Sequence, residues 1–419
     1  MEETKTVKQA KKKLNALPII MCWLAYTAAY LGRFSYASNI ISIESFYGVL
    51  HADAGLVSTC FFFAYGAGQV INGIFNKRYN KKYVMSGALI VSAIVNFLFF
   101  LRIPFNYLKY LWLLNGVAQS VLWPCLIALL SDTLKKSDLP SALVALSSTV
   151  ATGTFLAYGA SALFTYFNAF YLSFLFGTIS MAIIAVLWVF KYNKAFVLNV
   201  ERDEEEETTT QSTQKTKGVL GRAIIILLVV LCLCAVVDNL VKDGLNTWVP
   251  SILKENFHLD DSLSIILTLV LPVLGFFGGS FNPYLEKKLK SFVPLLGFWF
   301  LLTAIFTVVV ILFLNTSWIV VLLSFGLISL FTHGANGVVT GMAPLYMRDK
   351  INSGLLAGIL NGCCYVGSTI SSYCLGLVAD NVGWTGVFVL LLVVCCVPIV
   401  ITAIMTIVKA IKSKKAVNN

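Results

Sequence analysis

Two positively charged side chains lie inside long apolar segments of this sequence. Arg33 belongs to the segment 17-38, and Lys242 belongs to the segment 221-246. A charge at the centre of a bilayer costs at least ~2.5 to 3.5 kcal/mol, so a cation in such a segment indicates a functional site. Guanidinium and ammonium groups both bind anions, and a guanidinium can hold one oxyanion through two parallel hydrogen bonds. The pair therefore predicts a binding site for a small anionic solute.

Arg33 has hydroxyl groups near it on the same helix face. Tyr26, Tyr30 and Arg33 follow the i, i+4, i+7 spacing that brings side chains together on a helix. The alternative is an arginine whose long side chain reaches the membrane surface and binds nothing. We favour the binding role, with Tyr30 as a second ligand beside Arg33.

Lys242 has acidic neighbours that allow more than one interpretation. Asp238 lies one helical turn before it, and Asp243 follows it directly. Asp238 and Lys242 can form a structural ion pair, in which case Lys242 binds no solute. Otherwise Lys242 binds the solute, and Asp238 or Asp243 has a coupling role by taking up a proton or exchanging partners. The sequence leaves these possibilities open.

Further polar side chains recur at helical spacing in other apolar segments. Such side chains often only join helices by hydrogen bonds, yet together they predict a polar seam inside a helix bundle. We expect the following to contact the solute: Tyr65, Gln69, Gln119, Trp123, His333, Asn336, Asn361 and Tyr365.

The apolar segments indicate an all-α membrane protein. The 419-residue chain is 58% hydrophobic and 12% charged, which is more apolar surface than a water-soluble fold can cover. About 20 apolar residues cross the hydrocarbon layer as a helix. We predict twelve transmembrane helices, at 17-38, 54-75, 83-103, 108-131, 141-165, 168-190, 221-246, 261-283, 291-314, 317-341, 352-379 and 383-408.

The predicted helices fall into two similar halves. The longest hydrophilic stretch follows the sixth helix, and its acidic and Thr-rich composition is typical of a flexible linker. In each half a basic residue, Lys13 or Arg222, precedes the isolated cation by twenty residues. We predict two pseudo-symmetric six-helix bundles with the site between them. The domains are an N-terminal half (1-190), a cytoplasmic linker (191-220) and a C-terminal half (221-419).

The positive charges predict the orientation in the membrane. A formal net charge of +11 also suits a nucleic-acid partner, but the positions of the charges favour the bilayer instead. If the N-terminus is cytoplasmic, the dense Lys and Arg clusters all fall in cytoplasmic segments, as the positive-inside rule requires. Five cations lie elsewhere, namely Arg33, Arg102, Lys109, Lys242 and Lys254. Both termini and the linker are therefore expected in the cytoplasm, and no nucleic acid is expected as a partner.

The sequence lacks the patterns of catalytic and metal sites. All ten cysteines lie in apolar segments, so we expect neither disulfides nor a metal site. The three histidines, His51, His258 and His333, are not spaced as zinc ligands, and no Walker loop is present. We expect a protein that is not an enzyme and has no cofactor.

Several short motifs are similar to those of a known transporter family. They are Tyr30-Leu31-Gly32-Arg33, Ala64-Tyr65-Gly66, Asn115-Gly116 with Gln119 and Trp123-Pro124-Cys125, Lys242-Asp243-Gly244 with Trp248-Val249-Pro250, and Asn381-Val382-Gly383-Trp384. Together they resemble the organophosphate:phosphate antiporter family of the major facilitator superfamily (MFS), which includes glycerol-3-phosphate and hexose-6-phosphate carriers.

The resemblance implies the MFS fold and a secondary transporter that exchanges a sugar phosphate or glycerol phosphate for inorganic phosphate by alternating access. It implies that one arginine from each half grips the phosphate. Arg33 matches the first arginine, whereas Lys242 stands in place of the second and Gln69 in place of a family lysine. Rival interpretations are a carboxylate or other organic-anion carrier, and a transporter-like sugar-phosphate sensor. We expect a carrier that works as a monomer in a bacterial inner membrane.

Overall fold

The computed structural model describes residues 16–75, 78–135, 138–197, 222–348, 350–351 and 353–417. Every regular element in these residues is helical, which confirms the predicted all-α class. The elements are α1 (Ala16–Ser38), α2 (Ile40–Tyr47), α3 (His51–Phe75), α4 (Lys81–Phe100), α5 (Phe105–Ser120), α6 (Leu122–Thr133), α7 (Leu139–Tyr166), α8 (Leu172–Phe196), α9 (Arg222–Phe257), α10 (Asp261–Leu267), α11 (Val270–Gly278), the 3₁₀ helix η2 (Gly279–Phe281), α12 (Asn282–Leu289), α13 (Phe292–Phe313), α14 (Trp318–Asn336), the π-helix η3 (Gly337–Met342), α15 (Ala343–Tyr346) and α16 (Ser353–Val417).

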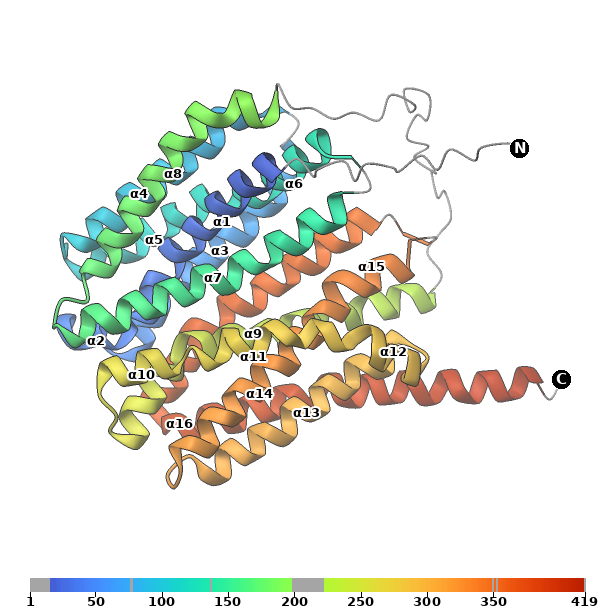
Figure 1. The fold of residues 1–419 in the computed structure, drawn as a ribbon. Helices are drawn as coiled ribbons and strands as arrows, with labels where there is room; N and C mark the ends of the chain where they lie inside the picture. The colour runs from blue at the N-terminus through green and yellow to red at the C-terminus, as the bar shows by residue number, and fades with distance from the viewer. Residues whose placement is uncertain are drawn as a thin grey trace, which may run out of the picture.

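Among the described residues, eleven helical segments are long and apolar enough to cross a membrane. The last of them, Leu355–Val408, has 54 residues, more than twice the length that one crossing needs. Gly383 interrupts α16 with φ 79° and ψ 176°, a conformation that glycine adopts readily because it has no Cβ. The chain reverses there (Figure 1), so α16 supplies both of the last two predicted crossings.

The structure differs from the predicted segments at their ends and inside three of them. The helix predicted at 221-246 continues to Phe257 through Pro250, because the residues around this proline are packed in the core. Three predicted spans are interrupted: α5 and α6 meet at Val121, α10 and α11 are separate, and η3 follows α14. The linker prediction falls largely on residues 198–221, outside the described residues, while α8 extends to Phe196.

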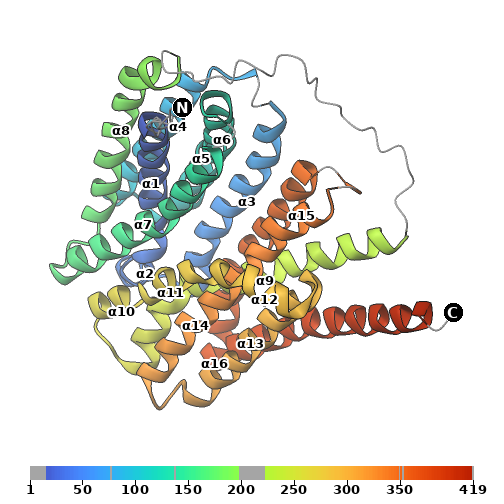
Figure 2. The same cartoon turned by 45° about the vertical axis from the view of Figure 1, so that its right-hand side comes forward.

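The helices gather in two bundles, α1–α8 and α9–α16 (Figures 1 and 2). We call the end that holds α2 and α10 the distal end, and the opposite end, where α1 begins and α16 ends, the terminal end. The bundles lie side by side at the distal end, where α2 contacts α9 and α10 contacts α7, and they diverge toward the terminal end (Figure 2). Helices α3 and α16 form the largest contact between the bundles.

The apolar cores follow this arrangement. The first bundle contains two clusters of buried side chains, and the second bundle contains one. Ile40, Ile41, Tyr158 and Ala162 come from the first bundle but pack in the core of the second. The distal interface is therefore continuous with a hydrophobic core, which favours close packing of the bundles at that end.

Candidate substrate-binding site

Arg33 lies in an aromatic box at the middle of the molecule. Its side chain is only 7% exposed. The guanidinium carbon lies 4.1 Å from the ring centre of Tyr65, 4.6 Å from that of Tyr30 and 5.0 Å from that of Phe61. Cation–π contacts of this kind stabilise a buried cation without neutralising its charge. The guanidinium is thus held inside the protein, and the alternative of a side chain that extends to the membrane surface does not describe it.

Two amides from α5 orient this guanidinium. Arg33 Nε donates a hydrogen bond to Gln119 Oε1 at 3.2 Å, and Gln119 Nε2 donates to Asn115 Oδ1 at 3.2 Å. Both amide side chains are fully buried. Arg33 Nη2 is buried and has no hydrogen-bond partner in the described part of the chain. A buried donor without a partner is costly, so this nitrogen marks where a ligand acceptor would bind.

A polar chain joins the Arg33 box to the second bundle. Gln69 Nε2 donates to the Tyr65 hydroxyl at 2.8 Å, and Asn361 Nδ2 donates to Gln69 Oε1 at 2.7 Å. The rings of Tyr65 and Tyr365 lie 4.8 Å apart. Gly66 permits this contact, since a Cβ there would lie 2.6 Å from Tyr365 Cβ. Four of the predicted residues therefore meet across the α3–α16 contact.

Tyr26 links one more predicted residue to this group. Its hydroxyl lies 3.3 Å from the Tyr65 hydroxyl, and its ring lies 5.2 Å from that of Trp123. Tyr26 also packs edge-on against Tyr30 at 4.9 Å. The i, i+4, i+7 spacing in the first helix thus predicted a real cluster, to which Trp123 belongs only through Tyr26.

The acidic residues of α9 are bound by neighbouring helices. Asp238 is fully buried, and its Oδ2 accepts a hydrogen bond from Asn336 Nδ2 at 3.2 Å, while its Oδ1 has no partner in the described residues. Asp243 accepts a hydrogen bond from Ser368. In the described part of the chain neither carboxylate forms an ion pair with Lys242. Of the two possibilities that the sequence left open, a direct Asp238–Lys242 ion pair is not the one seen in these residues; amide and hydroxyl donors from α14 and α16 bind the carboxylates instead.

His333 and Asn336 both lie on α14, which packs against α9, the helix of Lys242. The imidazole Nδ1 of His333 donates to the Ser329 carbonyl at 2.8 Å, and its ring packs where Gly275 has no side chain. The Lys242 side chain lies in the neighbourhood of Tyr30 in the first bundle and of His333. The π-helix η3 begins directly after Asn336, and such irregular turns are frequent at functional sites. The predicted residues thus form two groups, one around Arg33 that extends across the α3–α16 contact and one around Asp238 and Asn336 in the second bundle.

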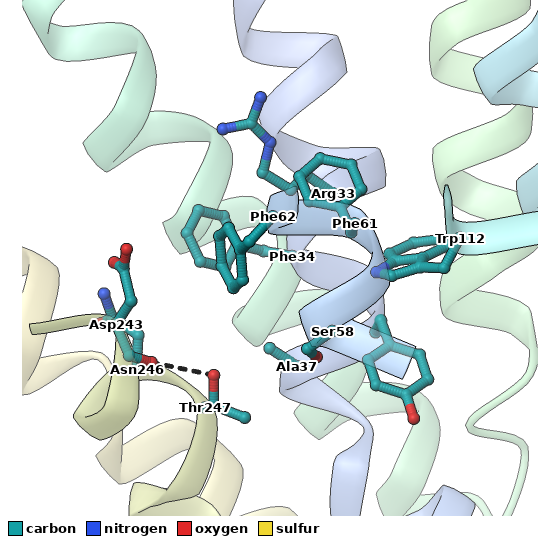
Figure 3. Close-up of a pocket in the computed structure, with 11 residues that line it drawn as sticks. Arg33, Phe34, Ala37, Ser58, Phe61, Phe62, Trp112, Asp243, Asn246 and Thr247 are labelled. Atoms are coloured by element: carbon teal, nitrogen blue, oxygen red, sulfur yellow. Dashed lines mark hydrogen bonds between the residues drawn. The ribbon is translucent and has the colours of Figure 1, made fainter. Parts of the chain in front are cut away.

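A small cavity lies on the distal side of Arg33. Its volume is about 20 Å³, room for about one water molecule. In Figure 3 the Arg33 guanidinium points away from the polar end of this cavity, where Ser58, Asn246 and Thr247 lie, and phenylalanine rings stand between them. The cavity is too small for an organic solute.

A second polar cluster escaped the sequence analysis. Glu44, His51 and Glu255 offer ligand atoms that lie within 4.8 Å of one another, as a metal-binding group would. These residues come from α2, α3 and α9, and no local spacing in the sequence connects them. The Asn381–Trp384 motif was the one signal near this cluster, since Trp384 donates to Glu255 at 2.7 Å.

Eleven helical segments of the described residues that are able to cross a membrane, gathered in two bundles of similar size, are the architecture of a carrier of solutes across membranes. A family profile described as Major Facilitator Superfamily matches residues 22–348. The chain belongs to this superfamily, and its family and fold are those of transporters. The predicted MFS fold is confirmed.

Two curated proteins are similar to this chain in sequence, and a solved transporter is similar to it in structure. Sugar phosphate exchanger 3 of Mus musculus is 24% identical over 378 residues, covering 80% of this chain and 76% of the relative. Membrane sensor protein UhpC of Escherichia coli (strain K12) is 22% identical over 396 residues, covering 89% and 88%. A bacterial homologue of the human lysosomal transporter Spinster, solved in an inward-facing and occupied conformation, superposes with a TM-score of 0.73 at 13% identity, covering 96% and 98%.

Proposed function

We propose that this protein carries a sugar phosphate or glycerol phosphate across a bacterial inner membrane in exchange for inorganic phosphate, by alternating access. The observation that carries the proposal is Arg33, a buried guanidinium oriented through Nε by Gln119 with its Nη2 donor unused. Such a group suits an oxyanion, which it can bind through two oxygens. The names of the sugar phosphate exchanger and of the sensor support the same solute class.

The residues around Arg33 have different roles in the proposed solute site. Tyr30 and Tyr65 offer hydroxyl donors beside Arg33, and Lys242 adds a second positive charge from the other bundle. Asn336 and His333 complete the polar wall of the second bundle. Gln119 acts as a positioning residue, because it binds Arg33 itself. Gln69, Asn361 and Tyr365 form the contact between the bundles that bounds the site. Trp123 packs against Tyr26 within the first bundle.

The coupling role falls to Asp238 rather than Asp243. Arg33, Lys242, Asp238 and Asp243 sum to zero net charge, so a phosphate ester, with a charge of about −1.5 to −2, leaves an excess of negative charge in a low-dielectric site. Protonation of one carboxylate offsets that excess. Asp238 is the candidate, since its Oδ1 is buried without a partner, whereas Asp243 is bound by Ser368.

The proposed orientation of the protein in the membrane follows from the positions of its Lys and Arg clusters. We place the terminal end, both termini and the 191-220 linker in the cytoplasm by the positive-inside rule. The bundles diverge toward that end (Figure 2), which supports a state with the site facing the cytoplasm. A single chain contains both cations, which supports a functional monomer.

Counterflow in proteoliposomes tests this function. Vesicles preloaded with inorganic phosphate should accumulate labelled glucose-6-phosphate or glycerol-3-phosphate, and Arg33→Gln vesicles should not. Uptake of a dicarboxylate but of no phosphate ester would replace the proposal with an organic-anion carrier. Binding of a phosphate ester without any flux would favour the sensor, the role named for the Escherichia coli relative.

A further inference from the structure

The cluster at the distal end joins the two bundles through one histidine. His51 is the first residue of α3, and its Nδ1 lies 2.9 Å from Glu44 Oε1 in the same bundle. Its Nε2 lies 3.2 Å from Glu255 Oε1, near the end of α9 in the other bundle. Ionised carboxylates only accept hydrogen bonds, so both imidazole nitrogens must donate. The ring therefore acts as an imidazolium that bridges the bundles.

The surroundings of His51 make this bridge more than a surface ion pair. The side chains of His51 and Glu44 are 17% and 11% exposed, whereas Glu255 is 41% exposed. Exposed pairs contribute little, but Glu255 is also fixed by the Trp384 indole N–H, which donates to it at 2.7 Å. The His51 ring packs 5.4 Å from Trp248 and 5.1 Å from Trp384. Burial raises the pKa of the Glu44 carboxyl above its ordinary value, and the hydrogen bond from His51 opposes that rise. Glu44 thus depends on His51 to stay ionised.

A helix of one bundle is capped by the other bundle at the same place. Asp380 Oδ1 accepts a hydrogen bond from the His51 backbone N–H at 3.1 Å, and Asp380 Oδ2 accepts one from the Ala52 N–H at 2.8 Å. These are two of the unpaired donors at the start of α3, and a carboxylate is favoured at a helix N-terminus. Asp380 belongs to α16, so the cap lasts only while the bundles touch.

Two glycines allow the backbones to meet beside the cluster. A Cβ at Gly376 would lie 2.7 Å from the His51 carbonyl oxygen. A Cβ at Gly55 would collide with the Ser372 carbonyl oxygen. Both obstacles are backbone atoms, which cannot rotate away. The distal ends of α3 and α16 are therefore built to close tightly.

We infer that His51, with Glu255 and Asp380 as its partners in the second bundle, is the positioning residue that holds the distal ends together and so makes the solute site face the terminal end. This inference goes beyond the proposed function, because it holds for any solute. The two nitrogens of His51 face different carboxylates, so one metal ion could not replace both hydrogen bonds. Ion pairing, rather than metal binding, is the chemistry that the geometry favours.

Distance measurements by pulsed EPR test the inference directly. Spin labels are attached at Leu50→Cys and Val382→Cys, positions that are 64% and 68% exposed and lie at the distal ends of the two bundles, in a transport-competent chain without its native cysteines. With His51, Glu255 and Asp380 unchanged, the distance between the two spin labels should be predominantly short. His51→Gln and Glu255→Gln should lower the ratio of short to long distances about tenfold, as couplings between sites commonly do.

The matched control is an ion pair at the same end that lies within one bundle. Lys254 on α9 binds Asp261 on α10 at 2.8 Å, so Lys254→Gln should leave the distance distribution unchanged. His51→Arg, which keeps a cation able to reach two carboxylates, should restore the short distance. These labels report without any solute, so the result does not depend on the substrate proposed above.

Two outcomes would overturn the inference. One is an unchanged distance distribution in both His51→Gln and Glu255→Gln, with each variant monodisperse in detergent. The other is an equal shift in Lys254→Gln, which would make the effect a general loss of charge. Counterflow adds a kinetic readout: His51→Gln should slow exchange while leaving the solute concentration for half-maximal rate within about threefold.

Discussion

At the scale of single residues, the aromatic box explains why a positive charge survives in the middle of the membrane. Tyr30, Phe61 and Tyr65 face the Arg33 guanidinium with their rings, which repays part of the cost of removing it from water. None of these groups carries a negative charge. The full charge of Arg33 therefore remains for a solute, unlike that of an arginine paired with a carboxylate.

Replacing Arg33 with lysine tests this arrangement. Arg33→Lys keeps the charge but loses both the Nε bond to Gln119 and the second donor, so counterflow of phosphate esters should fall about 10- to 100-fold. Expression and thermal stability in detergent should stay close to normal. The control is Arg102→Lys, at an exposed arginine of the distal end that stacks on Tyr171, which should transport normally. Wild-type rates in Arg33→Lys would remove Arg33 from the solute ligands.

Lys242 permits a test in two directions. Because no ion pair engages its ammonium group among the described residues, Lys242→Ala should abolish transport but cost little stability. Lys242→Arg should preserve or raise transport of phosphate esters, since a guanidinium can bind an oxyanion through two parallel hydrogen bonds.

The double variant Asp238→Asn with Lys242→Ala separates binding from charge neutralisation. If Lys242 binds the solute, the double variant should insert stably and remain inactive. Normal counterflow by this variant would reduce Lys242 to neutralising Asp238 and leave Arg33 as the sole anion-binding charge.

Spacing along one helix predicted part of the site, and contacts between helices supplied the rest. Tyr26, Tyr30 and Arg33 share a face because 3.6 residues make a turn, so their cluster is visible in the sequence. Asn336 and Ser368 reach Asp238 and Asp243 from helices about 100 residues away. No local pattern records such contacts, and for this reason the sequence alone left the partner of Asp238 open.

At the scale of elements, α3 depends on close backbone approach at one point. Gly55→Ala places a methyl group against the Ser372 carbonyl oxygen, so the distal ends should fail to close fully. We expect a loss of about 1 to 3 kcal/mol in stability, as for other overpacked positions, and a marked loss of counterflow. Gly73→Ala on the same helix is the control, because its Cβ would meet nothing within 4 Å. Equal behaviour of the two variants in thermal unfolding would contradict this account of the α3–α16 contact.

Hydropathy predicted the positions of the transmembrane helices but not the breaks inside them. A window of apolar residues looks the same whether or not a helix breaks inside it, so the junction of α5 and α6 at Val121 was invisible. The short helix α2, Ile40–Tyr47, was missed because eight residues cannot span a bilayer. The break between the last two helices was predicted at 380-382, next to the observed break at Gly383, since glycine marks a turn.

At the scale of the whole molecule, the two bundles set a requirement on topology. Helix α1 begins and α16 ends at one end of the molecule (Figure 1), and we assign this end to the cytoplasm by the positive-inside rule. A cysteine at Thr210 should therefore be protected from an impermeant thiol reagent in intact cells. A cysteine at Tyr166, 72% exposed at the distal end of α7, should react. Reversed labelling of the two positions would invert the orientation, and the parent chain without added cysteines gives the background.

The cap that Asp380 places on α3 has a consequence for isotope exchange. The amide hydrogens of His51 and Ala52 are protected by a carboxylate of the opposite bundle, and an amide exchanges with solvent only while its hydrogen bond is open. Each separation of the distal ends exposes these two amides to deuterium, whereas the amides deeper in α3 stay protected by their own helix. Their deuterium uptake should therefore accelerate when a transported solute is added. The uptake rate of a peptide that covers the start of α3 would then report how often the distal ends separate during transport.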